Sequence, residues 1–173
     1  MKDALAIHRW LLAHQVHHEI VRLPRPMTCA DELPEMISAG ADRCVSVTVF
    51  EGSTRRGRSV VATVHTVAAP PRPAVVGALV GTRNIHLAPA FLVNAVTDYA
   101  APLVCPLLLP ESLTVLVDER LRPDRTPIFT PTGERHTALA MRALDLLTLL
   151  SRKLVDLRTQ RPSGSRQAVA LRH

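Results

Sequence analysis

Aromatic residues are scarce in this chain of 173 residues, at 3% of the total, whereas apolar residues make up 47%. The expected core is therefore aliphatic, and the chain is long enough for one domain with a real core. Few aromatic rings are present on which nucleic-acid bases could stack. The composition therefore argues against a single-stranded nucleic-acid binder of the stacking kind.

Cysteine is scarce as well, with three copies at Cys29, Cys44 and Cys105 and no CxxC spacing. An odd number without that spacing fits a reducing cytosol and argues against a disulfide framework or a zinc site. We therefore expect a cytoplasmic protein. A cysteine nucleophile at Cys44 or Cys105 is an alternative, but a buried cysteine usually acts as a small hydrophobic residue.

Several sequence signals are missing. No run reaches the roughly 18 apolar residues that a membrane-spanning helix needs, and acidic and histidine residues within the first apolar run make it a poor signal peptide. There is no phosphate-binding loop and no GxSxG motif. The HxxHH pattern of His14, His17 and His18 has no carboxylate or cysteine to complete a metal site. We therefore expect no membrane association, no metal and no cofactor.

Positive charge is concentrated at the C-terminal end. The formal net charge is +6, and the residues from 151 onward hold six basic residues and one acid, a net of +5. Such a segment can bind a polyanion or only increase solubility. The stretch RPSGSRQ from Arg161 has the composition of a flexible linker or tail. We predict a domain over residues 1–157 and a basic flexible tail over residues 158–173.

Predicted helices and strands alternate irregularly within this domain. Strand chemistry marks DRCVSVTVFEG (residues 42–52) and VVATVHTVA, and the Gly-rich basic connection between them predicts a β-hairpin. PRPAVVGALVG predicts a helix that begins at proline and ends at Gly81. ALDLLTLLSRKLVDL predicts a long apolar helix. Helices interspersed with consecutive strands indicate an α+β domain rather than regular βαβ winding.

The first strand of the predicted hairpin has two unlike faces, because successive side chains of a strand point to opposite sides. One face carries only valines, and the other carries a thiol and two hydroxyl groups. The valines are Val45, Val47 and Val49, and the polar set is Cys44, Ser46 and Thr48. The polar face is either a solvated surface or the wall of a site.

Six segments, taken in order, resemble the prolyl-tRNA-editing, YbaK-type domain, a family of bacterial aminoacyl-tRNA deacylases. They are RCVSVTVFEG, the helix that ends at Gly81, HLAPAFLVNAVTDY, the proline-rich TDYAAPLVCPLLLP, LTVLVDERL, and TGERHTALAM with ALDLL. The resemblance covers roughly residues 1–155. It implies a mixed β-sheet, curled into a barrel-like shape and flanked by helices. It also implies hydrolysis of the ester that joins a wrong amino acid to the 3′ end of a tRNA.

The chain departs from the pattern of this family at several positions. The typical lysine of the opening strand falls on Ser46, a typical Pro-Gly-Asp loop falls near residues 66–68, and two typical glycines fall on Pro102 and Leu103. Pro106 and Gly133 match the pattern. A lysine supplies a fixed positive charge where serine supplies one neutral donor, and proline has no N–H. The scaffold is therefore better matched than the site.

The resemblance implies that Ser46 occupies the catalytic position, where it would orient the substrate. The implied substrate-binding residues are Cys44, Thr48, Pro102, Cys105, Pro106, Thr132 and Gly133. The implied partners are the 3′ end of an aminoacyl-tRNA and an aminoacyl-tRNA synthetase. Two other functions stay open: a non-catalytic relative that binds tRNA, a synthetase or a small ligand, and a structural homodimer without a ligand.

Overall fold

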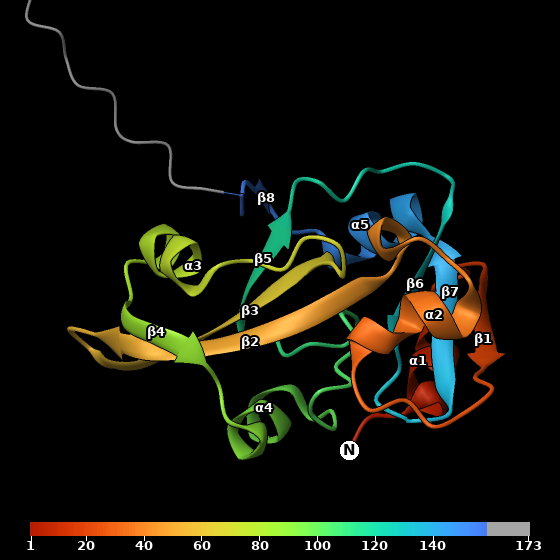
Figure 1. Ribbon diagram of the computed structural model, residues 1–173, viewed down its shortest axis with the longest axis horizontal. Coiled ribbons are helices and arrows are strands. Elements are labelled where there is room, and N and C mark those ends of the chain that lie inside the picture. The colour runs from red at the N-terminus through yellow and green to blue at the C-terminus, as the bar shows by residue number, and fades with distance from the viewer. Residues whose placement is uncertain (159–173) are drawn as a thin grey trace, which may run out of the picture.

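The computed structural model describes residues 1–158, in which two β-sheets are flanked by helices (Figure 1). The smaller sheet has three antiparallel strands in the order β1-β7-β6. Their bounds are His18–Arg22 for β1, Pro127–Pro131 for β6 and Thr137–Arg142 for β7. Helix α1, Ala4–Ala13, precedes this sheet and begins after Asp3, whose carboxylate accepts a hydrogen bond from the Ala6 N–H at 2.8 Å.

The larger sheet has five strands in the order β4-β2-β3-β5-β8. Their bounds are Val45–Thr54 for β2, Gly57–Thr66 for β3, Arg83–Leu87 for β4, Thr114–Asp118 for β5 and Leu154–Val155 for β8. β4, β2 and β3 pair antiparallel, whereas β5 is parallel to both β3 and β8. An isolated bridge between Cys44 and Phe129 joins the two sheets. The expected mixed α+β fold is therefore confirmed.

The remaining helices are short and lie between the strands. Their bounds are Leu33–Ile37 for α2, Pro73–Val80 for α3, Ala90–Thr97 for α4 and Ala143–Leu150 for α5, and single 3₁₀ turns occupy Ala30–Glu32 (η1) and Ala41–Arg43 (η2). As predicted, α3 begins at proline and ends at Gly81, which has a φ of 66°. The last helix is shorter than predicted, because Ser151 takes a left-handed conformation and the chain then pairs with β5 as β8.

The main core lies on the valine face of β2. Val45, Val47 and Val49 pack there with side chains from α1, β5 and α5. Cys44, on the opposite face, belongs to a separate cluster with Leu33 of α2. The two faces of the strand are thus covered by different parts of the chain.

Within residues 1–158, no helix has the length and apolar character needed to cross a membrane. The same residues contain no group of three or more His, Cys, Asp or Glu side chains placed to hold a metal ion. The HxxHH pattern is split, since His14 bonds to the Trp10 carbonyl whereas His18 bonds to His8. The basic tail predicted from Arg158 lies outside the described residues except for Arg158 itself, which pairs with Asp156.

Gly133, in the β6–β7 connection, packs closely against the buried Tyr99. Its φ is 92°, and a Cβ at this position would lie 2.7 Å from the Lys2 carbonyl oxygen and 2.8 Å from Cδ1 of Tyr99. The Tyr99 ring cannot move aside freely, because it is fully buried and its hydroxyl donates to the Leu107 carbonyl at 2.8 Å. A side chain at position 133 is therefore excluded by both conformation and space.

We expect Gly133→Ala to lower the free energy of unfolding by about 2–3 kcal/mol, since strain and a steric clash add. Gly81→Ala is the matched control: Gly81 also has a positive φ, but a Cβ there would meet no atom within 4 Å. The control should lose only about 1 kcal/mol. Urea unfolding of both variants measures the difference, and equal losses would show that the contact with Tyr99 is unimportant.

Candidate functional site

Strand β2 is paired on both sides along only part of its length. β3 pairs with all of Val45–Thr54, whereas β4 pairs only within residues 50–53. The last contact on the β4 side is a hydrogen bond of 2.9 Å from the Ala88 N–H to the Val49 carbonyl. Pro89 follows, has no N–H and precedes the first residue of α4. The stretch of β2 before Val49 therefore has an edge that β4 does not cover.

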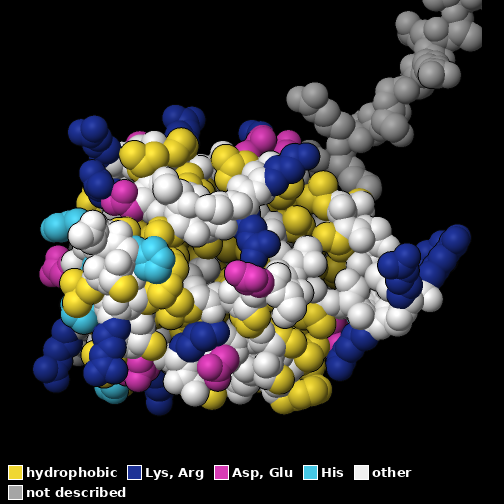
Figure 2. Space-filling model, turned by 180° about the vertical axis from the view of Figure 1, so that it is seen from behind, with side chains coloured by type: hydrophobic (Ala, Val, Ile, Leu, Met, Phe, Trp, Pro, Cys, Tyr) yellow, Lys and Arg dark blue, Asp and Glu magenta, His cyan; other side chains and the backbone are white. Residues whose placement is uncertain are grey.

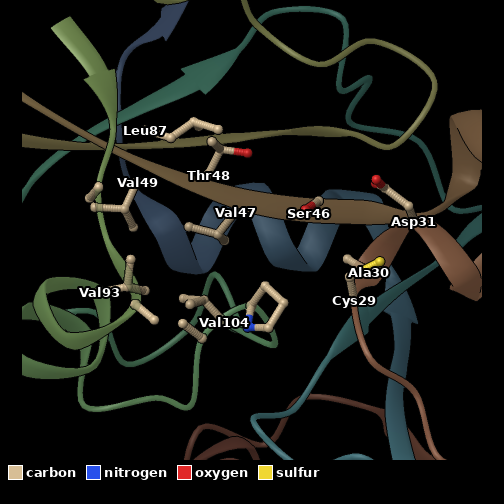
Figure 3. A pocket seen from close by; sticks show the side chains of 14 residues that line it. Cys29, Ala30, Asp31, Ser46, Val47, Thr48, Val49, Leu87, Val93 and Val104 are labelled. Carbon is tan, nitrogen blue, oxygen red and sulfur yellow. The ribbon is translucent and has the colours of Figure 1, made fainter.

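A cavity of about 480 Å³ lies along this open edge (Figure 3). Its walls come from four segments: residues 46–49 of β2, 29–31 around η1, 87–93 of β4 and α4, and 101–104 of the proline-rich segment. Because the cavity follows an edge, side chains from both faces of β2 reach it. The backbone contributes as well: the Val49 carbonyl points toward β4, so by alternation the N–H and C=O of Val47 point to the same side.

The cavity has an apolar half and a polar half. Val47, Val49 and Val93 gather with Val104 in the apolar half, as Figure 3 shows. The polar half contains Ser46, Thr48 and the carboxyl group of Asp31. Ser46 is 8% exposed, and its hydroxyl makes no hydrogen bond to any described residue, so that it is available to a ligand.

Thr48 forms a hydrogen bond to a buried histidine. Its Oγ1 lies 2.8 Å from Nε2 of His65 on β3, and His65 is 3% exposed. Nδ1 of the same ring lies 2.8 Å from the Thr66 carbonyl oxygen. Because a carbonyl can only accept, Nδ1 carries the hydrogen, and Nε2 of the neutral ring accepts from the Thr48 hydroxyl. Burial lowers the pKa of His65, which favours this neutral form.

The polar face of β2 continues across the sheet. Ser46 is opposite His65 in the β2–β3 register. On β5, Val117 pairs with Val64, so the next residue, Asp118, comes level with His65. Asp118 is 1% exposed, and its carboxylate accepts hydrogen bonds of 2.6 and 2.9 Å from the Arg120 guanidinium. Three neighbouring strands thus contribute one buried polar row, of which Ser46 lines the cavity.

The structure brings together only part of the site that the sequence predicts. Ser46, Thr48 and Pro102 line the cavity, and the other five residues do not: Cys44, Cys105, Pro106, Thr132 and Gly133. Cys44 and Cys105 are fully buried in two different clusters, and Pro106 borders a separate hollow beside Trp10. The Thr132 hydroxyl bonds to that of Thr137 at 2.7 Å.

Asp31, which lines the cavity, and His65, which bonds to Thr48, were not predicted from the sequence as site residues. His65 could have been found, because it is the one histidine in the stretch VVATVHTVA, whose other residues are small or aliphatic. Once the hairpin turn is placed at residues 55–56, the antiparallel register puts His65 opposite Ser46. Asp31 has no comparable signal, since the position of the 3₁₀ turn η1, and not a residue pattern, brings it to the cavity.

Comparison with known proteins connects this geometry with one family. The family model of the aminoacyl-tRNA editing domain matches residues 26–149. Similar solved structures include the hypothetical protein APE2540, with a TM-score of 0.74 and 18% identity over 87% of this chain and 97% of that one. A candidate trans-editing enzyme for prolyl tRNA synthetase has a TM-score of 0.67 and 22% identity over 83% and 87%. At these identities the two structures share the fold. No curated protein matches the sequence.

We expect the three cysteines to differ sharply in reactivity. Burial raises the pKa of Cys44 to about 11 and that of Cys105 to about 12, so neither forms the reactive thiolate near neutral pH. Iodoacetamide at about pH 8 should therefore modify Cys29, which is partly exposed at the cavity wall, and spare the other two. Peptide mass spectrometry of folded and urea-unfolded protein measures this. Labelling of Cys44 or Cys105 in the folded protein as fast as Cys29 would contradict the expectation.

Proposed function

Because the chain belongs to the aminoacyl-tRNA editing domain family, we propose that it is a deacylase that hydrolyses the ester of a mischarged tRNA in the cavity beside β2. The division of this cavity into an apolar half and a hydroxyl-bearing half is the observation that carries the proposal. An aminoacyl ester has the same division, with a side chain on one side of its α-carbon and polar groups on the other.

The two halves suggest how such an ester would bind. An uncharged side chain would contact Val93 and Val104, and the ester would lie against Ser46 and Thr48. Asp31 carries the charge opposite to that of the α-ammonium group. The Ser46 hydroxyl would donate to the carbonyl oxygen, where negative charge develops during hydrolysis.

A basic surface lies within reach of the cavity. Arg55, Arg56 and Arg83 border a hollow at the tip of the β2–β3 hairpin, where Figure 2 shows Lys and Arg side chains projecting from the molecule. These three have no carboxylate partner among residues 1–158, unlike Arg58, which pairs with Glu51. β4 leads from this surface to the cavity over four residues, about 13 Å. A tRNA whose 3′ end enters the cavity could therefore place phosphates on the arginines, and a synthetase would supply the mischarged tRNA.

The second candidate function is a non-catalytic relative that binds the tRNA end. The charge of the polar half favours it, because Ser46 is neutral and Asp31 is negative, so no fixed positive charge faces the ester. Loss of one donor to a developing oxyanion can cost about 10²–10³ in rate. The two candidates share the cavity and differ in turnover.

Deacylation of a panel of mischarged tRNAs, measured as loss of labelled aminoacyl-tRNA, tests the proposal. The wild type should hydrolyse at least one of them. Ala90→Trp places a large ring at the cavity wall and should lower kcat/KM at least about tenfold, in the range that misplacement of a substrate costs. Ala95→Trp is the control, since Ala95 is exposed on the same helix but away from the cavity.

A wild type that hydrolyses no tRNA would overturn the deacylase proposal. The non-catalytic candidate would then stand if the protein still binds aminoacyl-tRNA and if Ala90→Trp, but not Ala95→Trp, weakens that binding.

We expect Arg55→Ala/Arg56→Ala to weaken tRNA binding and to reduce the slope of log K against log salt by up to about 2, because fewer counterions are released. The matched control is Arg9→Ala/Arg22→Ala, which removes the same charge from exposed positions on α1 and β1. Binding titrations at several salt concentrations provide the slopes. Equal slopes for the two double variants would exclude the hairpin tip as a phosphate contact.

A further inference from the structure

Thr48 and His65 have the geometry of a nucleophile and its base. The Thr48 hydroxyl donates to Nε2 of a neutral His65 at 2.8 Å, and the Thr66 carbonyl holds the ring through Nδ1. A base that is within hydrogen-bond reach of a hydroxyl and is itself oriented by a third group is the arrangement that activates serine and threonine. The hydrogen of the Thr48 hydroxyl is committed to His65, so that the lone pairs of Oγ1 stay free on a residue that lines the cavity.

We propose that Thr48 is the nucleophile of this site and His65 its base, so that deacylation passes through an acyl-Thr48 ester. The inference rests on the proposed function, but it concerns different residues from the lysine position of the family pattern. It assigns a role to the polar face of β2, where the hydroxyl of Thr48, which lines the cavity, contacts the buried imidazole of His65 on the next strand.

The reaction balances without a metal or a cofactor. Oγ1 of Thr48 attacks the acyl carbonyl carbon, and its proton moves to Nε2 of His65. The bond between that carbon and the ribose oxygen breaks, and the oxygen takes the proton from Nε2. Water then attacks the acyl-Thr48 carbonyl and gives a proton to His65, which returns it to Oγ1 as the ester bond breaks. The products are the free amino acid and the uncharged tRNA.

The surroundings of His65 suit a base that is neutral at rest and charged only during the reaction. Burial keeps the pKa of His65 below its ordinary value, whereas the Thr66 carbonyl, Asp118 and Asp31 oppose that shift. Arg120, which pairs with Asp118, adds positive charge nearby. The same two carboxylates stabilise the imidazolium once the proton has been transferred. Its charge arises directly across the strands from Ser46, where the family pattern has its lysine.

Three variants separate the chemical role from a structural one. Thr48→Val keeps the shape without the hydroxyl, Thr48→Ser keeps the hydroxyl, and His65→Gln can accept a hydrogen bond but not a proton. On a tRNA that the wild type deacylates, Thr48→Val and His65→Gln should lose on the order of 10²–10⁴-fold in kcat. Thr48→Ser should stay within about tenfold of the wild type. Thr114→Val, at an exposed position on β5, is the control and should be unchanged.

The pH profile is the readout that a purely structural His65 would not move. The base acts only when unprotonated, so the wild-type kcat should rise with pH through a pKa below the ordinary value for histidine and then level off. His65→Gln should lose this rise. A rise that persists in His65→Gln would overturn the assignment of the base.

The second measurement does not depend on tRNA. The protein is mixed with an activated p-nitrophenyl ester of a small aliphatic amino acid, quenched in acid and analysed by peptide mass spectrometry. We expect the acyl mass on the peptide that contains Thr48 in the wild type and in Thr48→Ser, and not in Thr48→Val. No adduct, together with tRNA deacylation that survives Thr48→Val, would overturn this inference and leave the proposed function intact. An adduct on Thr48 without hydrolysis of any tRNA would support the pair and overturn the proposed function.

Discussion

The site depends on one constraint, the point at which β4 leaves β2. Near the hairpin tip, the absence of a side chain at Gly52 allows β2 and β4 to lie close together. A Cβ at Gly52 would lie 2.3 Å from Cγ2 of Thr82 and 2.7 Å from the Arg83 carbonyl oxygen. At the inner end Pro89 has no N–H to continue the ladder, and α4 begins there instead. The cavity occupies the edge that results, and α4 forms its opposite wall. The cavity therefore follows from two residues that set how far β4 can pair.

An open edge also explains why valines and hydroxyl groups share one cavity. Alternation along β2 predicts that one face is buried and that the other forms the site, yet Val47 and Val49 line the cavity together with Ser46 and Thr48. The pattern of a single strand describes its faces but not its edges, because an edge is defined by the neighbouring strand. The absence of β4 beside residues 46–48 is the feature that a one-strand pattern cannot contain.

Sequence predicted the parts of the fold that depend on neighbours along the chain. The β2–β3 hairpin and the proline-to-glycine limits of α3 are such parts, and both are confirmed. The helix after Ala143 is shorter than predicted, because Leu154–Val155 pairs with the distant edge of β5. Of the three residues of the proline-rich segment that were predicted for the site, only Pro102 lines the cavity, since Cys105 packs in the core and Pro106 borders the hollow beside Trp10. Contacts between distant segments decided each of these differences.

The charge of the side chain at position 46 affects the protonation of His65. The two residues are opposite one another in register, so their Cβ atoms lie roughly 5 Å apart. A lysine at position 46 would hold a permanent cation beside His65 and would oppose its protonation. A serine leaves His65 able to accept the proton of Thr48, and positive charge then appears beside the ester only while the proton is held. In the proposed mechanism, a serine at position 46, where the sequence resemblance implies a lysine, therefore leaves the buried histidine able to act as a base.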